Sequence, residues 1–231
     1  MRSRWIFLTF ALCTAGVCTY LGFWQVSRHR ERAGANALAE VARRRPVVVL
    51  PGPSDEIIPL APVTLTGEFD HEQEIVLRGR AHHGAPGVEV ATPFRLAGGS
   101  LAVIVIRGFV PSDDAFGIDR GAIREPGPRT IHGEAFALDS SARGGLPIIR
   151  RSDTTWQRVD RADLGRLPYP VMPLGVRQTK DSGMTGFPIR LGAPALSAGP
   201  HLSYAIQWFG FALIFAGGGI AYTFRQAKES D

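Results

Sequence analysis

The chain has 231 residues, of which 45% are hydrophobic, and carries a formal net charge of +5. This composition is too apolar for a disordered chain, and the length suits one domain of ordinary size. Positions 25–201 hold 22 Arg and Lys residues against 19 Asp and Glu residues, and no recognition-helix or zinc-finger pattern occurs. We expect no nucleic-acid partner, because net charge alone describes only non-specific attraction.

Two long apolar stretches lie near the ends of the sequence. Trp5–Trp24 has 20 residues and Leu202–Phe224 has 23, and neither contains a charged side chain. A helix of about 20 apolar residues crosses a hydrocarbon core of about 30 Å. We expect the first stretch to remain as an anchor, because it is longer than the apolar core of a signal peptide and no small-residue cleavage site follows it.

The two spans divide the chain into five segments. We predict a tail with the first transmembrane helix at 1–24, a helical stem at 25–45, a β domain at 46–198, a second transmembrane helix at 199–224 and a tail at 225–231. Two spans place both termini on one side of the membrane. We expect a multi-pass protein of the bacterial inner (plasma) membrane whose helices contact membrane lipid. Both termini would be cytoplasmic and the large loop extracytoplasmic.

The middle segment has the pattern of an antiparallel β domain, because turn residues separate short β-branched runs. We expect strands at 47–50, 63–69, 74–78, 87–96 with an interruption at Pro93, 101–110, 130–138, 148–150 and 171–178. The 101–110 run is apolar on both faces up to Arg107, which indicates a central strand. A short helix fits 160–167, with Asp160 as its N-cap. The predicted fold is therefore two transmembrane helices flanking a mainly antiparallel β extramembrane domain, a sandwich or open barrel with a short helix.

The β segment shows no catalytic motif, since nucleotide-binding loops and the nucleophile elbow are absent from the sequence. Adjacent His82 and His83 would point to opposite faces of a strand, so we interpret them as an exposed loop. Asp113, Asp114 and Asp119 are interpreted as capping or solvated residues of a turn. We predict that the protein is not an enzyme.

The cysteines do not suggest a metal site. Cys13 and Cys18 both lie in the first span, five positions apart, so their side chains point about 140° apart around a helix. We interpret both as small membrane residues.

The entry to the second span combines a histidine with aromatic and amide side chains. Pro200 is expected in the first helical turn, which places His201 at the membrane interface. The helix dipole disfavours the imidazolium there and keeps the ring able to bind a metal. Tyr204 and Trp208 share the face of His201, and Gln207 is costly within a span unless it has a partner. The alternative is an interfacial aromatic belt with an incidental histidine.

The end of the first span carries complementary residues. Gln25, Arg28 and Arg32 form a polar stripe next to Trp24. An arginine at this depth can pair with a carboxylate. A flat amphiphile with a metal centre and two carboxylates would suit both helix ends, and haem has this description. The sequence does not indicate a second axial ligand.

Four stretches of the sequence form a recognisable set: Leu21-Gly22-x-Trp24-Gln25-x-x-Arg28, Gly67-Glu68-Phe69-Asp70, Arg107-Gly108-Phe109-Val110-Pro111 and the run from His201 to Ala212. Together they resemble the surfeit locus protein 1 family. The likeness extends nearly end to end in order and spacing. The sequence departs from the family where Phe109 replaces a common tryptophan, and where Arg32 stands for the basic residue usual soon after Arg28.

The resemblance implies a role in assembling haem-copper cytochrome c oxidase. It implies haem A as a transiently bound cofactor, with His201 as the iron ligand, and the oxidase catalytic subunit as a partner, with haem A synthase as a second candidate partner. We expect Tyr204, Gln207, Trp208, Trp24, Gln25 and Arg28 to complete the haem site. The alternative is a structural membrane chaperone for the oxidase subunit that never binds haem. An enzyme that modifies haem would need more histidines within more spans.

Overall fold

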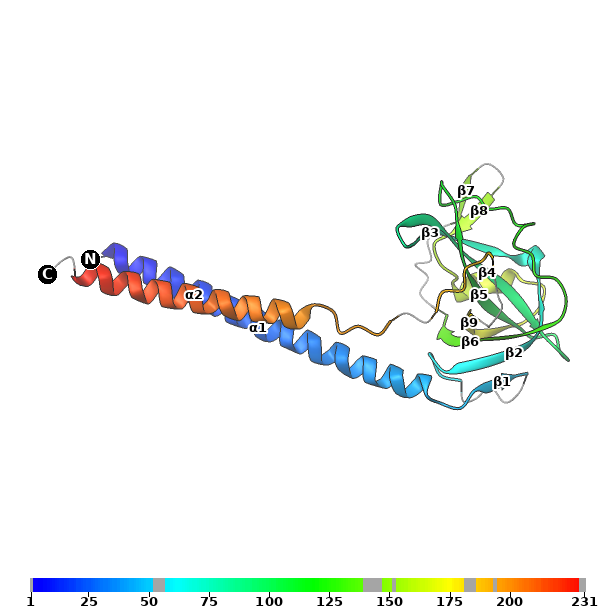
Figure 1. The fold of residues 1–231 in the computed structure, drawn as a ribbon, viewed down its shortest axis with the longest axis horizontal. Coiled ribbons are helices and arrows are strands. Elements are labelled where there is room, and N and C mark those ends of the chain that lie inside the picture. Colours follow the sequence, from blue (N-terminus) through cyan, green and yellow to red (C-terminus); the bar gives the residue numbers. More distant parts are fainter. Residues whose placement is uncertain are drawn as a thin grey trace. The chain divides into compact units, whose positions relative to one another are not determined.

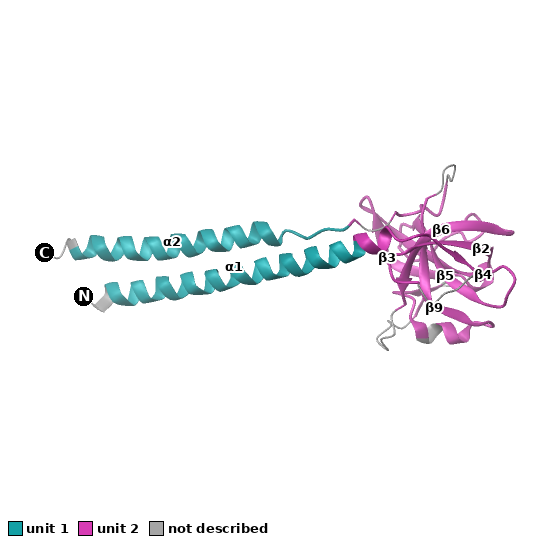
Figure 2. Ribbon diagram, turned by 90° about the horizontal axis from the view of Figure 1, so that it is seen from below, with its two compact units in different colours: residues 1–39, 196–231 teal, residues 40–195 magenta. Residues whose placement is uncertain are grey.

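A computed structural model describes residues 2–51, 57–138, 147–150, 153–180, 186–192 and 195–228 (Figure 1). The chain forms two compact units, residues 1–39 with 196–231 and residues 40–195 (Figure 2). The first unit is a pair of long helices and the second is a β domain.

The first unit is built on helices α1 (Arg2–Arg43) and α2 (His201–Lys228). Helix α1 continues past Trp24 because the sequence up to Arg43 contains no proline. Both helices are long and apolar enough to cross a membrane, over Arg4–Arg43 and His201–Ala227. They lie side by side, with the start of α1 and the end of α2 at the same end of the pair (Figures 1 and 2). Two apolar helices at the termini fit a membrane protein with a middle domain.

The β domain is a single sheet that closes on itself. The order of its nine strands is β1-β2-β6-β9-β5-β4-β3-β8-β7, and an additional β2–β4 pairing joins β2, β6, β9, β5 and β4 into a ring. The strands are β1 (Val48–Leu50), β2 (Pro62–Phe69), β3 (Ile75–His82), β4 (Ala85–Leu96), β5 (Ala102–Pro111), β6 (Arg129–Ala137), β7 (Ile148–Arg150), β8 (Asp153–Trp156) and β9 (Val171–Gln178). The predicted fold class, two helices flanking a mainly antiparallel β domain, is confirmed.

The ring closes at Gly67. This residue pairs with Arg129 on β6 and with Leu96 on β4, so β2 changes partner there. A Cβ atom on Gly67 would overlap the carbonyl oxygen of Arg95. Glycine is required at this position because two backbones approach each other closely.

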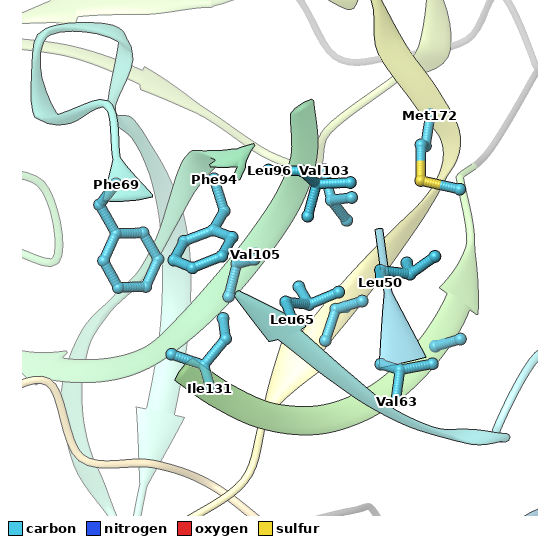
Figure 3. Close-up of a cluster of buried hydrophobic side chains, with 12 residues drawn as sticks. Leu50, Val63, Leu65, Phe69, Phe94, Leu96, Val103, Val105, Ile131 and Met172 are labelled. Carbon is cyan, nitrogen blue, oxygen red and sulfur yellow. The ribbon is translucent and has the colours of Figure 1, made fainter. Parts of the chain in front are cut away.

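The interior of the ring holds the main hydrophobic core (Figure 3). Alternate residues of β2 point inward, among them Val63, Leu65 and Phe69. Strand β5 contributes Val103 and Val105 to this core, while its other face packs in a second cluster. The residues of that second cluster are Leu77, Ala91, Ile104, Ile106, Leu138, Val159 and Leu164. Burial on both faces explains the continuous apolar run of β5.

Pro93 does not interrupt its strand, contrary to the sequence prediction. Strand β4 continues through Pro93, which pairs with Ile104 of β5. On the other edge of β4, pairing with β3 ends at Ala91, and pairing with β2 begins at Phe94. Pro93 therefore lies in the gap between two partners, where no backbone donor is needed.

Two further details differ from the prediction. Strand β8 was not expected, and it pairs in parallel with β3. The predicted helix at 160–167 is a 3-10 helix, η2 (Arg161–Arg166). Asp160 occupies the N-cap position without a capping hydrogen bond, and its carboxylate pairs instead with Arg158 at 2.8 Å.

Candidate functional site

Small side chains let the two helices of the first unit approach each other. On α1 the residues Ala11, Ala15, Cys18 and Gly22 are buried at spacings of three and four residues. A Cβ atom on Gly22 would lie 2.5 Å from the ring of Phe209. Small residues at such positions are typical of helix packing in membranes.

His201 is the first residue of α2, and its side chain is paired with α1. Its Nδ1 atom lies 2.8 Å from Oε1 of Gln25, and both residues are half-buried. Pro200 lies just before the helix, and its carbonyl accepts the N–H of Tyr204 at 3.1 Å. The structure thus brings together His201 and Gln25, which are 176 positions apart in the sequence.

The other residues predicted on α2 are more exposed. Tyr204 is 46% exposed, and Gln207 is exposed without a side-chain hydrogen bond to another described residue. Trp208 is half-buried and makes an edge contact with Phe211, at 6.0 Å between ring centres. These side chains are available to a bound molecule but make no described contact with His201.

The residues predicted on α1 have different partners. The guanidinium of Arg28 lies 5.8 Å from the ring centre of Trp24 and pairs with Glu31 at 2.9 Å. Arg28 and Trp24 are about half exposed, and Arg32 is exposed as well. Gln25 pairs with His201 of α2, whereas Arg28 pairs with Glu31 of its own helix.

His29 lies one turn beyond Gln25 on the same helix face and is half-buried. Its Nδ1 atom is buried and has no hydrogen-bond partner within the described ranges of the chain. The heptad spacing of the small residues Cys18 and Gly22, continued to Gln25 and His29, is the sequence signal that identifies this face.

The residues at this end of the helix pair fit a haem. A ring nitrogen of His201 remains for iron, the nearby surface is aromatic, and Arg28 is exposed for a carboxylate. The described parts of the chain contain no group of three or more His, Cys, Asp or Glu residues placed to hold a metal ion. A metal that brings its own macrocycle needs only one or two protein ligands. The two cysteines of α1 differ in exposure, since Cys18 is buried and Cys13 is exposed.

A buried ion cluster in the β domain was missed by sequence reasoning. Arg107 is fully buried, and its guanidinium pairs with Glu74 at 2.8 Å and with Glu125 at 3.0 Å. Arg129 and Arg190 also pair with Glu125. Burial raises the pKa of Glu125, but the charge and hydrogen bonds of Arg107 and Arg190 outweigh it, so that this pKa lies below its ordinary value.

The cluster is extended by uncharged contacts. Thr92 donates to Glu74 at 3.1 Å, and Arg107 lies 5.0 Å from the ring centre of Phe69. Arg107 and Phe69 belong to two of the stretches that resemble the surfeit locus protein 1 family. We assign the cluster to the architecture of the barrel, since Arg107 is fully buried.

The polar residues of the β loops are explained by local structure. The interpretation of His82 and His83 as an exposed loop is wrong for His82, which ends β3 half-buried with its ring tilted against Phe109, at 5.6 Å between ring centres. His83 is exposed in a turn, as expected. Asp114 accepts the backbone N–H groups of Gly117 and Phe116, which lower the pKa of its carboxyl to about 2. Asp119 accepts backbone N–H groups in the same manner.

Together these features define a class: a protein with two helices long and apolar enough to cross a membrane, a closed β domain between them in the sequence and a histidine as the first residue of the second helix. The SURF1 family profile matches residues 12–213. A SURF1-like protein of Monosiga brevicollis is 29% identical over 222 residues, covering 90% of this chain and 84% of the relative. Human surfeit locus protein 1 is 24% identical over 233 residues, which cover 90% of this chain and 73% of the human protein.

A SURF1-like protein of Mycobacterium tuberculosis is 26% identical over 231 residues, covering 93% of this chain and 81% of the relative. Bacterial and eukaryotic relatives therefore match along most of their length. The chain belongs to the SURF1 family.

Proposed function

We propose that this protein is a membrane-bound assembly factor for haem-copper cytochrome c oxidase that binds haem A and delivers it to the catalytic subunit. Membership of the SURF1 family, a family of assembly factors, supports the role in oxidase assembly. The observation that supports haem handling is the pairing of His201 with Gln25, at 2.8 Å, at one end of two apolar helices.

In this proposal haem A is cargo, not the cofactor of a reaction. His201 would hold the iron, Arg28 would pair with a propionate, and Trp24, Tyr204, Gln207 and Trp208 would contact the macrocycle. Arg28 can exchange its exposed partner Glu31 for a propionate at little cost, because the side chains of both are about half exposed. One protein ligand and an exposed wall suit transient binding better than a closed pocket.

The proposal includes an orientation and partners. Both termini would be cytoplasmic, and the β domain would lie outside the cytoplasm, where it would contact the oxidase subunit. Haem A synthase would supply the cargo. No catalytic step is assigned to the chain.

The test is an optical spectrum of the full-length protein, co-expressed with the haem A pathway and purified in detergent. We expect bound haem A in the wild type, loss of it in His201→Ala, and no loss in the control His83→Asn, whose ring is exposed in a turn of the β domain. Unchanged haem content in His201→Ala would contradict the role of this histidine.

The second candidate function is a structural chaperone for the oxidase subunit that binds no haem. Edge strand β7 favours it, because Ile148 and Ile149 on this strand are 43% and 73% exposed. Exposed apolar residues on an edge strand can receive a partner. If His201→Ala leaves oxidase assembly intact and an Ile149→Lys variant abolishes it, this second function is the correct one.

A further inference from the structure

The hydrogen bond between Gln25 and His201 fixes which ring nitrogen can bind a metal. A carbonyl oxygen only accepts hydrogen bonds, so Nδ1 of His201, 2.8 Å from Oε1 of Gln25, carries the proton. In a neutral imidazole the other nitrogen, Nε2, then carries the lone pair. The pair therefore presents Nε2 as the ligand atom.

The residue before Pro200 lies beside this nitrogen and is a glycine. Gly199 has φ +71°, in the left-handed region that favours glycine. An added Cβ atom at Gly199 would lie 3.4 Å from Nε2 and 3.3 Å from Cδ2 of His201. The flank of the ring that carries the free nitrogen is thus lined by a residue without a side chain.

The position of Gln25 is fixed by the packing of the helix pair. Gly22, one turn earlier on α1, is buried against the ring of Phe209. Phe23 also contacts Phe209, at 5.3 Å between ring centres. Gln25 and His201 are consequently held on elements that already pack, and the hydrogen bond needs no separate ordering of the two helices.

We infer that Gln25 is a positioning residue that holds His201 as the Nδ1–H tautomer and presents Nε2 to the haem iron. The inference rests on the proposed haem function and assigns Gln25 a role through His201 rather than through contact with the macrocycle. Partners of this kind set the ring orientation and the basicity of a histidine ligand. An uncharged amide leaves the ligand less basic than a carboxylate would, which suits a carrier that must release its cargo.

The experiment compares Gln25→Leu and Gln25→Glu in the full-length protein in detergent, with haemin as the probe. Gln25→Leu removes the acceptor, and we expect a 10- to 100-fold weaker haemin affinity. Gln25→Glu provides a stronger acceptor, so we expect a lower reduction potential and a higher iron–histidine stretching frequency than in the wild type. Gln25→Leu should shift both quantities in the opposite direction.

Asn36→Leu is the matched control, because it makes the same change from amide to leucine three turns farther along α1, about 16 Å away. It should leave affinity, potential and frequency at wild-type values. Helix content measured by circular dichroism verifies that each variant is folded.

The outcomes separate the inference from the proposed function. If the wild type binds haemin through His201 but both Gln25 variants keep its affinity and frequency, the inference is wrong and the function stands. If both variants shift the potential in the same direction, Gln25 acts only by packing and the inference is also wrong. If the wild type does not bind haemin, both are overturned.

Discussion

The helix pair and the barrel each use an arginine from a family-like stretch, in opposite ways. Arg107 is fully buried in the β domain, where its guanidinium pairs with two carboxylates. Arg28 is half exposed at the end of the helix pair, where it pairs with Glu31 of its own helix. The two residues have the same chemistry but differ in what their removal leaves behind.

This difference separates an arginine that stabilises the fold, Arg107, from one that can bind a ligand, Arg28. Removing Arg107 would leave Glu74 buried without its charged partner, which is costly in a low-dielectric interior. Removing Arg28 would leave Glu31 in water, where an unpaired carboxylate is fully hydrated. A group that can leave its present partner at little cost is free to bind a ligand.

The largest expected effect is therefore that of Arg107→Met. We expect it to lower the free energy of unfolding by about 3–5 kcal/mol, because it breaks a buried pair from one side. The measurement is urea unfolding of the full-length protein in detergent, followed by the β-sheet signal in circular dichroism. Arg28→Met should change this free energy by less than about 1 kcal/mol and should weaken haemin binding. Equal destabilisation by both variants would remove the distinction drawn between them.

Gly67 in the barrel and Gly22 in the helix pair allow the same comparison between the two units, with a smaller expected effect on stability. Gly67→Ala would overlap the carbonyl oxygen of Arg95, and backbone cannot move without breaking the β2–β4 pairing. We expect a loss of about 1–3 kcal/mol from this crowding. Gly22→Ala meets one edge of the Phe209 ring, which is a side chain and not backbone, and alanine favours the helix by about 1 kcal/mol, which offsets this crowding. It should leave the thermal unfolding midpoint nearly unchanged.

Two open glycines are the controls for these substitutions. Gly99→Ala has its nearest neighbour 3.9 Å from the added atom, and Gly16→Ala has none within 4 Å. If Gly67→Ala is as stable as Gly99→Ala, the ring does not depend on the close approach at Gly67.

Sequence reasoning predicted the elements better than their contacts. The run from Leu101 to Val110 correctly predicted a strand buried on both faces, because its apolar residues do not alternate with polar ones. Pro93 was misinterpreted because its tolerance depends on where β3 and β2 each pair with β4, which is a property of the whole sheet.

At the end of the helix pair and in the buried ion cluster, single residues could likewise be selected from the sequence, but their contacts could not. His201 could be selected from the sequence by its position after Gly199-Pro200, since helix starts have local signals. Its pairing with Gln25 could not, because it depends on the register between two helices that are far apart in the chain. In the sequence Arg107 is only the residue at which the apolar run is interrupted. Its partners Glu74 and Glu125 come from loops on either side of this strand in the sequence, which the fold brings near it.

The smallest expected effect concerns the pH dependence of the barrel and tests whether charge, rather than hydrogen bonding alone, holds the cluster. The pKa of Glu125 in the folded protein lies below its ordinary value of 4.5, because Arg107 and Arg190 outweigh the effect of burial. The folded state therefore binds protons less readily than the unfolded chain, and the stability from Glu125 is complete above about pH 4.5 and lost as the pH falls through the folded value.

Glu125→Gln should accordingly be less stable than the wild type at neutral pH, and the two urea midpoints should converge as the pH is lowered below 4.5. Asp114→Asn provides the contrast, because the pKa of Asp114 is lowered to about 2 by backbone N–H groups of an exposed turn, so its difference from the wild type should persist to lower pH. Midpoints of wild type and Glu125→Gln that stay parallel throughout this range would mean that the carboxylate acts through its hydrogen bonds alone. The buried arginine would then be held by geometry, and its contrast with Arg28 would rest on burial rather than on charge.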